Sequence, residues 1–238
     1  MSYNFKVFPI KTKQNLFLLW LKNLSITNLI ILINILLFVL STILLIVKPN
    51  FIRYLAIQPS SVMHGQYLWT IITSIFVHGG FFHLFINMFV LFSMGSLCER
   101  IVGRKRFIWF YMLSGIIAGL LFVFLAYFFG NSGIGLRIFG SPTDYAVGAS
   151  GAIFGIAALF MILIPKMRFS IIFLPFFSLP GYIMIPFVLF ATWIVSSSAN
   201  FGIGNTAHLG GFLCGIVYGL YLRYEYPKKV NALRRHFV

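Results

Sequence analysis

Apolar residues dominate this sequence in runs that approach or exceed the roughly 20 residues needed to cross the hydrocarbon core of a bilayer. The runs recur along most of the chain and are separated by polar, proline-containing or glycine-containing stretches. We therefore predict an all-α, polytopic bundle of six transmembrane helices. The expected spans are residues 28–47, 81–98, 107–129, 148–165, 181–197 and 206–222.

The connections between these spans differ in length and character. The longest, residues 48–80, contains prolines and amphipathic aromatic residues and is expected to rest at one membrane interface. Residues 130–147 form a second connection on the same side and begin with a turn signal. Residues 169–180 are apolar but are interrupted by Pro175 and Pro180. We expect them to form an interfacial lead-in to the fifth span.

Basic residues are distributed unevenly among the connections. In this layout one side holds 15 of the 18 Lys and Arg residues, and the other side holds Lys48, Arg53 and Arg137. The positive-inside rule then predicts that both termini are cytoplasmic. We divide the chain into a basic cytoplasmic arm (1–26), a membrane domain (27–222) and a basic cytoplasmic tail (223–238). The apolar stretch in the arm is too short for a signal peptide, so the arm is expected to stay attached.

The composition supports a membrane protein and limits its partners. Hydrophobic residues make up 60% and charged residues 9% of the chain, and the mean hydropathy is +0.97. In a membrane protein a net charge of +15 reports orientation and contact with anionic lipid at the cytoplasmic face, so we expect no nucleic-acid binding. Cys98 and Cys214 lie in or at the end of apolar segments and predict no disulfide framework.

Carboxylates are scarce, and their number excludes several kinds of protease. The chain has three: Glu99, Asp144 and Glu225. It lacks the two aspartates in facing spans that an intramembrane aspartyl protease needs, and it has no His-Glu-x-x-His motif for zinc. Glu99 and Glu225 fall at the cytoplasmic ends of their spans. A serine nucleophile on the outer side would therefore work without a triad acid, unless Asp144 folds back to it.

Three of the five histidines, His78, His83 and His208, lie near the outer ends of their segments. Ionisable residues are costly inside a membrane, so these three are expected to have a function. His64 lies in the long connection and is expected to be solvated, and His236 lies in the tail, where we expect no specific role. A metal site is disfavoured, because His78 and His83 are five residues apart, diverge on a helix and have no carboxylate nearby.

His83 and Asn87 are four residues apart and would share one face of a helix. One interpretation is a hydrogen-bonded pair that holds the second span to a neighbour. The other is a pair of donors aimed at a developing oxyanion. At the level of these two residues both interpretations stay open.

Ser150 lies between small residues at the start of the fourth span, in Gly148-Ala149-Ser150-Gly151. By itself such a serine indicates helix packing more than catalysis. Glycines, however, repeat every four residues in the fourth and sixth spans, at Gly151, Gly155, Gly211, Gly215 and Gly219. Helices with glycine faces pack closely, which would bring the Ser150 hydroxyl within reach of the His208 imidazole. The pattern predicts a Ser-His dyad.

Together these motifs resemble those of the rhomboid family of intramembrane serine proteases. Residues 69–88 are similar to the family's first-loop and second-span signature. Residues 148–151 resemble its Gly-x-Ser-Gly nucleophile motif, and Ala207-His208-Leu209-Gly210-Gly211 resembles the base motif of its final helix. Order and spacing agree over roughly residues 69–219.

The resemblance implies specific roles for the candidate residues. Ser150 would be the nucleophile and His208 the general base. The backbone N–H of Ser150 and the side chains of His83 and Asn87 would form the oxyanion site. His78 is similar to a second histidine that holds or hydrates that region. The family also implies a cavity open to the outer side and lateral access for a substrate helix near the fifth span.

The supporting positions carried over include Gly148, Gly151 and Phe154, and two positions depart from the family pattern. Where many members have Trp-Arg in the first loop, this chain has Trp69-Thr70. Where many have an aromatic hydroxyl four residues after the serine, it has Phe154. Phenylalanine can stack against His208 but cannot donate a hydrogen bond.

We therefore predict a serine endopeptidase that hydrolyses peptide bonds in or near the transmembrane segments of single-pass or multi-pass membrane proteins, without a metal or cofactor. We expect it in the plasma membrane, with its active site open to the non-cytoplasmic side. One alternative is a proteolytically inactive rhomboid-like protein that binds membrane clients, although such relatives typically lack the serine or the histidine. A small transporter is a second alternative, but inverted repeats that would support it are not apparent.

Overall fold

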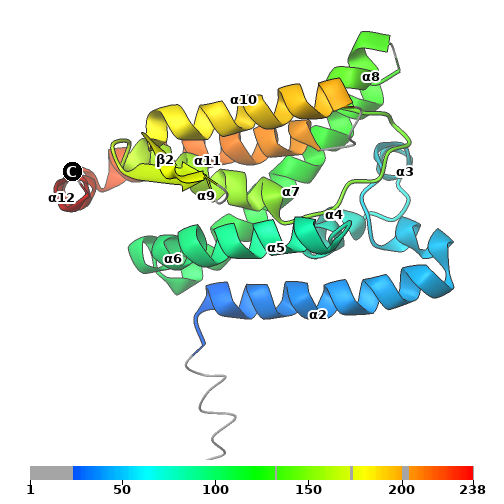
Figure 1. Ribbon diagram of the computed structural model, residues 1–238, viewed down its shortest axis with the longest axis horizontal. Helices are drawn as coiled ribbons and strands as arrows, with labels where there is room; N and C mark the ends of the chain where they lie inside the picture. The colour runs from blue at the N-terminus through cyan, green and yellow to red at the C-terminus, as the bar shows by residue number, and fades with distance from the viewer. Residues whose placement is uncertain (1–23, 132, 172–173, 200–203, 238) are drawn as a thin grey trace, which may run out of the picture.

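The computed structural model of the protein describes residues 24–131, 133–171, 174–199 and 204–237. This part of the chain is mainly helical, and its long helices lie side by side as a bundle (Figure 1). The predicted cytoplasmic arm falls almost entirely outside the described residues.

The helices follow the predicted spans to within a few residues. Their bounds are α2 Ile26–Val47, α5 Phe81–Val90, the π-helical turn η3 Leu91–Gly95, α6 Ser96–Val102, α7 Arg104–Phe129, α9 Ser150–Leu163, α10 Gly181–Ala199 and α11 Asn205–Glu225. Among the described residues, three segments are long and apolar enough to cross a membrane: 26–47, 81–102 and 104–129. Two more apolar helices, at 150–163 and 181–197, are shorter. The chain is thus a helical membrane bundle, and the count of six spans stays a prediction.

The long connection after α2 folds into short helices. They are η1 Pro49–Tyr54, α3 Pro59–Met63, α4 Thr70–Thr73 and η2 Ser74–Phe76. The Trp69 indole N–H donates to the Tyr54 carbonyl at 3.0 Å, which closes the connection on itself. Ile57 and Ala146 exchange backbone hydrogen bonds of 3.1 and 2.9 Å and so join it to the second connection, which contains α8 Gly133–Phe139.

The expected interfacial lead-in to the fifth span is instead a β-hairpin, which corrects the all-α prediction. Strands β1 Arg168–Ile171 and β2 Leu174–Pro180 pair antiparallel, with Phe169 opposite Leu179. Prolines 175 and 180 disfavour a helix here because each lacks a backbone donor, so the backbone groups of the two short strands satisfy one another across the pair.

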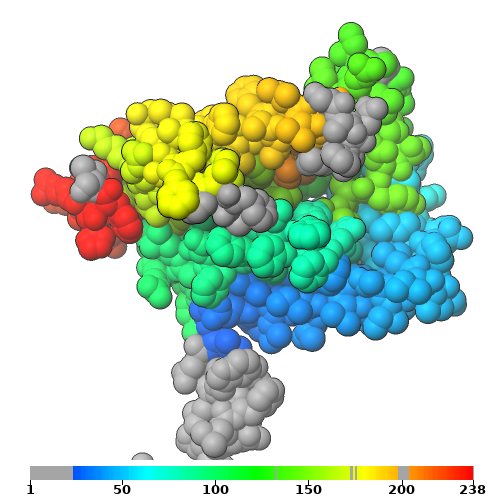
Figure 2. Space-filling view, in the orientation of Figure 1, coloured from blue at the N-terminus to red at the C-terminus, as the bar shows by residue number. Residues whose placement is uncertain are grey.

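The predicted tail is also structured. Helix α11 ends at Glu225, and α12 Pro227–His236 begins directly after it, with proline at the first helical turn. In Figures 1 and 2, α12 and α8 lie at opposite ends of the molecule.

Helix α9 lies at the centre of the bundle, between α7 and α11, with ten of its 14 residues buried. Its contact with α11 is made by backbone. A Cβ atom built on Gly211 would lie 1.8 Å from the Gly151 carbonyl oxygen, and one on Gly215 would lie 2.1 Å from the Gly155 carbonyl oxygen. Any side chain at these positions would push the helices apart, so the glycine spacing correctly predicted the close approach.

A second pair of glycines four residues apart, in α7, packs against a connection. Gly115 and Gly119 face the first connection, because Cβ atoms built there would lie 2.6 Å from Ile75 and 3.2 Å from Ile57. These glycines therefore leave room for loop side chains rather than for a second helix. The contact with Ile75 holds in place the segment that leads to His78.

Glu99 is a structural carboxylate. It is buried and accepts the backbone N–H groups of Ile26 (2.9 Å) and Thr27 (2.8 Å), together with the Thr27 hydroxyl (2.8 Å). These are unpaired donors at the start of α2, where the helix dipole also favours a negative charge. Glu99 therefore joins the end of α6 to the start of α2.

Candidate active site

Ser150 and His208 meet where α9 and α11 begin. The Ser150 Oγ lies 2.8 Å from the His208 Nε2, within hydrogen-bond distance. Ser150 is the first residue of α9, and His208 is in the first turn of α11. The glycine contacts between these two helices hold their backbones close enough for the short serine side chain to reach the ring.

No carboxylate among the described residues orients His208. Its Nδ1 is buried without a hydrogen-bond partner in that part of the chain. Asp144 does not fold back to it, since its Oδ2 accepts the backbone N–H of Ser141 at 2.8 Å within a turn. The ring of Phe154 stacks on the imidazole instead, with centroids 4.6 Å apart and planes 28° apart. Phe154 therefore restricts the tilt of the ring without a hydrogen bond.

Gly148 brings His83 to the serine. Its φ is +127°, a conformation that side chains rarely adopt, and its N–H donates to the Ser74 carbonyl at 2.8 Å. A Cβ atom on Gly148 would lie 2.7 Å from Cε1 and 2.8 Å from Nε2 of His83, and 3.7 Å from the Ser150 Oγ. The His83 ring and the Ser150 hydroxyl thus flank the same glycine.

The other two predicted oxyanion groups, the Ser150 N–H and the Asn87 amide, differ in the hydrogen bonds that they make. The first backbone bond of α9 runs from the Ile153 N–H to the Ala149 carbonyl at 3.0 Å, so the Ser150 N–H has no partner within its own helix. Asn87 is buried, and its Nδ2 donates to the His83 carbonyl at 2.8 Å. That bond stays within α5, so it does not tie α5 to a neighbour. It leaves the amide a second hydrogen.

His78 lies just before α5, and its ring packs edge-on against that of His83, with centroids 5.1 Å apart. In the described part of the chain neither of its ring nitrogens has a hydrogen-bond partner of normal geometry. Burial, and then the neighbouring His83, lower the pKa of His78 to about 3, although the Phe76 backbone opposes the shift. His78 is therefore a neutral imidazole next to His83 near pH 7.

Two groups that hold this site together were not predicted from the sequence. The Ser74 carbonyl anchors Gly148, and Ser114 of α7 faces Gly155 of α9, where a Cβ atom would lie 2.6 Å from the Ser114 Oγ. Ser114 and Ala118 are four residues apart, as are the glycines of the fourth and sixth spans. The packing role of Ser114 could therefore have been predicted from the sequence. A carbonyl partner such as Ser74 leaves no signal in side-chain patterns.

The remaining histidines lie in other surroundings. The Nδ1 of His64 is 2.6 Å from the Ser60 carbonyl, and the His236 ring packs edge-on against Phe237 at 5.1 Å. Within the described ranges there is no group of three His, Cys, Asp or Glu side chains that could hold a metal ion.

Helices of membrane-spanning length and a Ser-His contact at the ends of two glycine-packed helices define an integral membrane protein with a candidate serine hydrolase site. Residues 65–225 match the rhomboid domain, and the chain belongs to the rhomboid family.

Named relatives agree with this assignment. Rhomboid protein 1, mitochondrial, of Saccharomyces cerevisiae is 35% identical over 64% of this chain and 41% of its own length. The putative rhomboid protease YdcA of Bacillus subtilis is 34% identical over 65% of this chain and 66% of its own. The human presenilin-associated rhomboid-like protein, mitochondrial, is 31% identical over 73% of this chain and 42% of its own.

The matched region spans less than two thirds of each of these relatives. Two of the three are named as mitochondrial, so the comparisons do not support the plasma membrane that we expected. They support an integral membrane protein of this family.

Proposed function

We propose that this protein is an intramembrane serine endopeptidase, which hydrolyses peptide bonds in or near the transmembrane segments of membrane proteins. The observation that carries the proposal is the 2.8 Å contact between the Ser150 Oγ and the His208 Nε2, in a chain of the rhomboid family. A nucleophile within hydrogen-bond reach of a base is the arrangement that covalent catalysis requires.

In the first step the Ser150 Oγ attacks the carbonyl carbon of the scissile bond while the His208 Nε2 takes the hydroxyl proton. Negative charge then develops on the carbonyl oxygen. The donors that we assign to this oxygen are the Ser150 N–H, the His83 ring and the second amide hydrogen of Asn87. Such donors act strongly in a site with little water, because few other dipoles compete with them.

The second half of the reaction returns the enzyme to its starting state. His208 gives its proton to the leaving amine, the carbon–nitrogen bond breaks, and Ser150 keeps the acyl group. Water then attacks the ester carbonyl as His208 takes a proton from it. His208 returns that proton to the Ser150 oxygen, which leaves as the free hydroxyl, and the acyl group is released as a carboxylic acid. In our mechanism the Phe154 stack and the α9–α11 packing hold the imidazole, since no carboxylate does so in the described residues.

The proposed setting is a membrane domain of six spans, residues 27–222, between a cytoplasmic arm and a cytoplasmic tail. The distribution of Lys and Arg supports this layout. The Ser150 end then opens to the non-cytoplasmic side. Single-pass or multi-pass proteins would be cut near the outer ends of their spans.

Cleavage of a transmembrane reporter in liposomes tests the proposal. Purified Ser150→Ala and His208→Ala variants are expected to lose at least about a thousandfold in rate, since the residues of such a dyad act as a unit. Ser60→Ala and His64→Ala are matched controls on the first connection and should cleave like the parent protein. Undiminished hydrolysis by either dyad variant would exclude this mechanism.

A further inference from the structure

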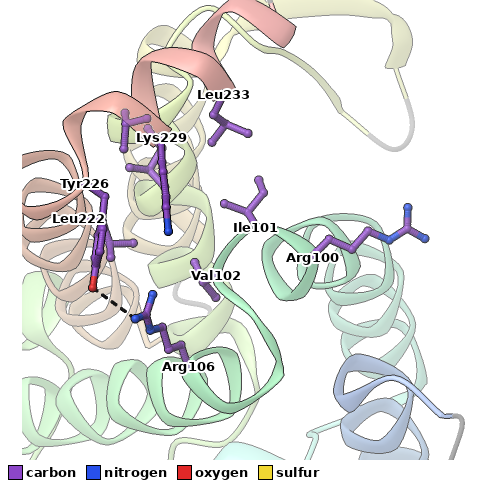
Figure 3. Close-up of a pocket in the computed structure, with 10 residues that line it drawn as sticks. Arg100, Ile101, Val102, Arg106, Leu222, Tyr226, Lys229 and Leu233 are labelled. Atoms are coloured by element: carbon purple, nitrogen blue, oxygen red, sulfur yellow. Dashed lines mark hydrogen bonds between the residues drawn. The ribbon is translucent and has the colours of Figure 1, made fainter.

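A cavity of about 310 Å³ lies at the end of the bundle away from Ser150, between the α6–α7 corner and α12. It reaches Leu163 at the end of α9, roughly 20 Å along the helix from Ser150 at 1.5 Å per residue. Figure 3 shows side chains from α6, α7, α11 and α12 around it. We call this cavity the basic pocket, and it is separate from the candidate active site.

One wall of the basic pocket holds two cations around a single aromatic ring. The guanidinium carbon of Arg106 and the Nζ of Lys229 each lie 5.3 Å from the centroid of the Tyr226 ring. Arg106 also donates to the Tyr226 hydroxyl at 3.3 Å. In Figure 3 the Arg106 side chain points toward the Tyr226 hydroxyl and the Lys229 side chain runs beside Tyr226, whereas the Arg100 head group points away. The ring therefore gathers two positive charges at one place.

Neither of these cations has an acidic partner in the described part of the chain. The ion pair found there joins Arg104 to Glu99 at 3.7 Å. None of the residues that line the basic pocket is acidic. Two like charges held together without a carboxylate repel each other, and an anion between them would remove that repulsion.

The rest of the lining includes an apolar wall. Val102, Leu163, Leu222 and Val230 line the basic pocket and are buried. Helix α12 is held over this wall by Arg234, which donates to the Leu163 and Ile162 carbonyls at 2.9 Å each. The wall is therefore built into the fold. An inorganic anion gains nothing from contact with an apolar surface. A phosphate that is attached to a glycerol and acyl chains can bury part of those chains against it.

We infer that the basic pocket binds the phosphate-bearing headgroup of an anionic phospholipid, with Arg106 and Lys229 on the phosphate and the start of an acyl chain on the apolar wall. Basic pockets between helices on the cytoplasmic side suit such headgroups. The volume is large enough for a headgroup, since small-ligand sites start at about 300 Å³. This proposal is more specific than the general attraction of a basic chain to anionic lipid, because it assigns the binding to two named cations.

Native mass spectrometry of the full-length protein in detergent tests this inference. The probes are an anionic and a zwitterionic phospholipid with identical acyl chains. Arg106→Gln/Lys229→Gln should bind the anionic lipid at least about tenfold more weakly, since each cation near an anionic surface contributes about fivefold. The matched control is Lys105→Gln/Lys228→Gln, which changes the neighbouring exposed residues and the same net charge. It should bind within about twofold of the parent protein, because neither residue lines the basic pocket and exposed charges away from the ligand are screened.

Three results would overturn the inference: equal losses in the two double variants, equal binding of the two lipids, or displacement of the lipid by equimolar inorganic phosphate or glycerol phosphate. The first would mean diffuse attraction, and the last a small-anion site. If the Arg106→Gln/Lys229→Gln protein does not fold, the single variant Lys229→Gln tests the inference. It should fold, because among the described residues the one interaction of the Lys229 side chain is its contact with the Tyr226 ring. About a fivefold loss is then expected, and an unchanged affinity contradicts the inference.

Discussion

Gly148 controls how closely His83 can approach Ser150. The position combines a left-handed φ with a contact that leaves no room for a methyl group. Gly65 shares only the first property, because its φ is +74° and nothing lies within 4 Å of a Cβ atom there. Substitutions at both positions place a side chain at a positive φ, but only a substitution at Gly148 also affects the contact with His83.

We predict that Gly148→Ala lowers the rate of reporter cleavage by about a hundredfold, the loss typical of removing one oxyanion donor, because the methyl group displaces the His83 ring. Gly65→Ala also places a side chain at a positive φ, but outside the site, and should keep the parent rate. Steady-state kinetics of both variants check this. Equal rates for the two variants would contradict the role of His83 as an oxyanion donor.

His78 gives the protein a pH-dependent stability. Its pKa is about 3 in the folded chain and near 6.5 when unfolded, so between these values the unfolded state binds more protons. Stability is then expected to fall as the pH drops from 6.5 toward 3, by up to about 1.4 kcal/mol per pH unit. Thermal unfolding in detergent across this range should show a shallower slope for His78→Asn. The exposed His64→Asn serves as the control, and a slope unchanged by His78→Asn would contradict the assignment.

At the scale of elements, the contact between α9 and α11 determines whether the dyad forms. The sequence could predict it, because both spans carry glycines at the same four-residue spacing, and two such faces can pack closely on each other. The hairpin at β1 and β2 and the seating of Ile75 and Ile57 on α7 could not be predicted in the same way. They depend on which surfaces meet after the chain folds, and local pattern does not specify that.

Gly211→Ala should separate α9 from α11, since its Cβ atom would lie 1.8 Å from the Gly151 carbonyl oxygen. We expect a lower unfolding temperature, from an overpacking cost of about 1–3 kcal/mol or more, together with loss of cleavage. Gly133→Ala in α8 meets nothing within 4 Å and is the control. Calorimetry or a thermal-shift assay measures the difference, and an unfolding temperature equal to that of Gly133→Ala would show that the helices do not touch here.

For the whole molecule, the candidate site was easier to predict than its surroundings. Ser150 and His208 stand in short motifs whose residue types and order are enough to indicate a family. The role of Glu99 could not be predicted this way. Its carboxylate joins α6 to α2 across more than 70 residues of sequence, and a sequence gives no distance between such points. The basic pocket likewise unites residues from separate helices.

The proposed orientation makes a prediction about the whole chain. Cysteines introduced at Ser61 on the first connection and at Lys228 on α12 should face opposite sides of the membrane, because the excess of Lys and Arg lies on the α12 side. A membrane-impermeant thiol reagent added to sealed vesicles should label one of them and spare the other until the vesicles are opened. A Lys105→Cys variant should follow Lys228→Cys. Labelling of Ser61→Cys and Lys228→Cys from the same side would refute the layout.

The central claim is that His208 activates Ser150 as a nucleophile, and covalent labelling with a fluorophosphonate probe tests it without knowledge of the substrate. Peptide mass spectrometry of the labelled membrane protein should find the probe on Ser150. The label should be lost in His208→Ala and kept in His64→Ala. An unlabelled Ser150 in the parent protein, or labelling that survives His208→Ala, would contradict the account; the first result is the one expected of a rhomboid-like protein that only binds membrane clients.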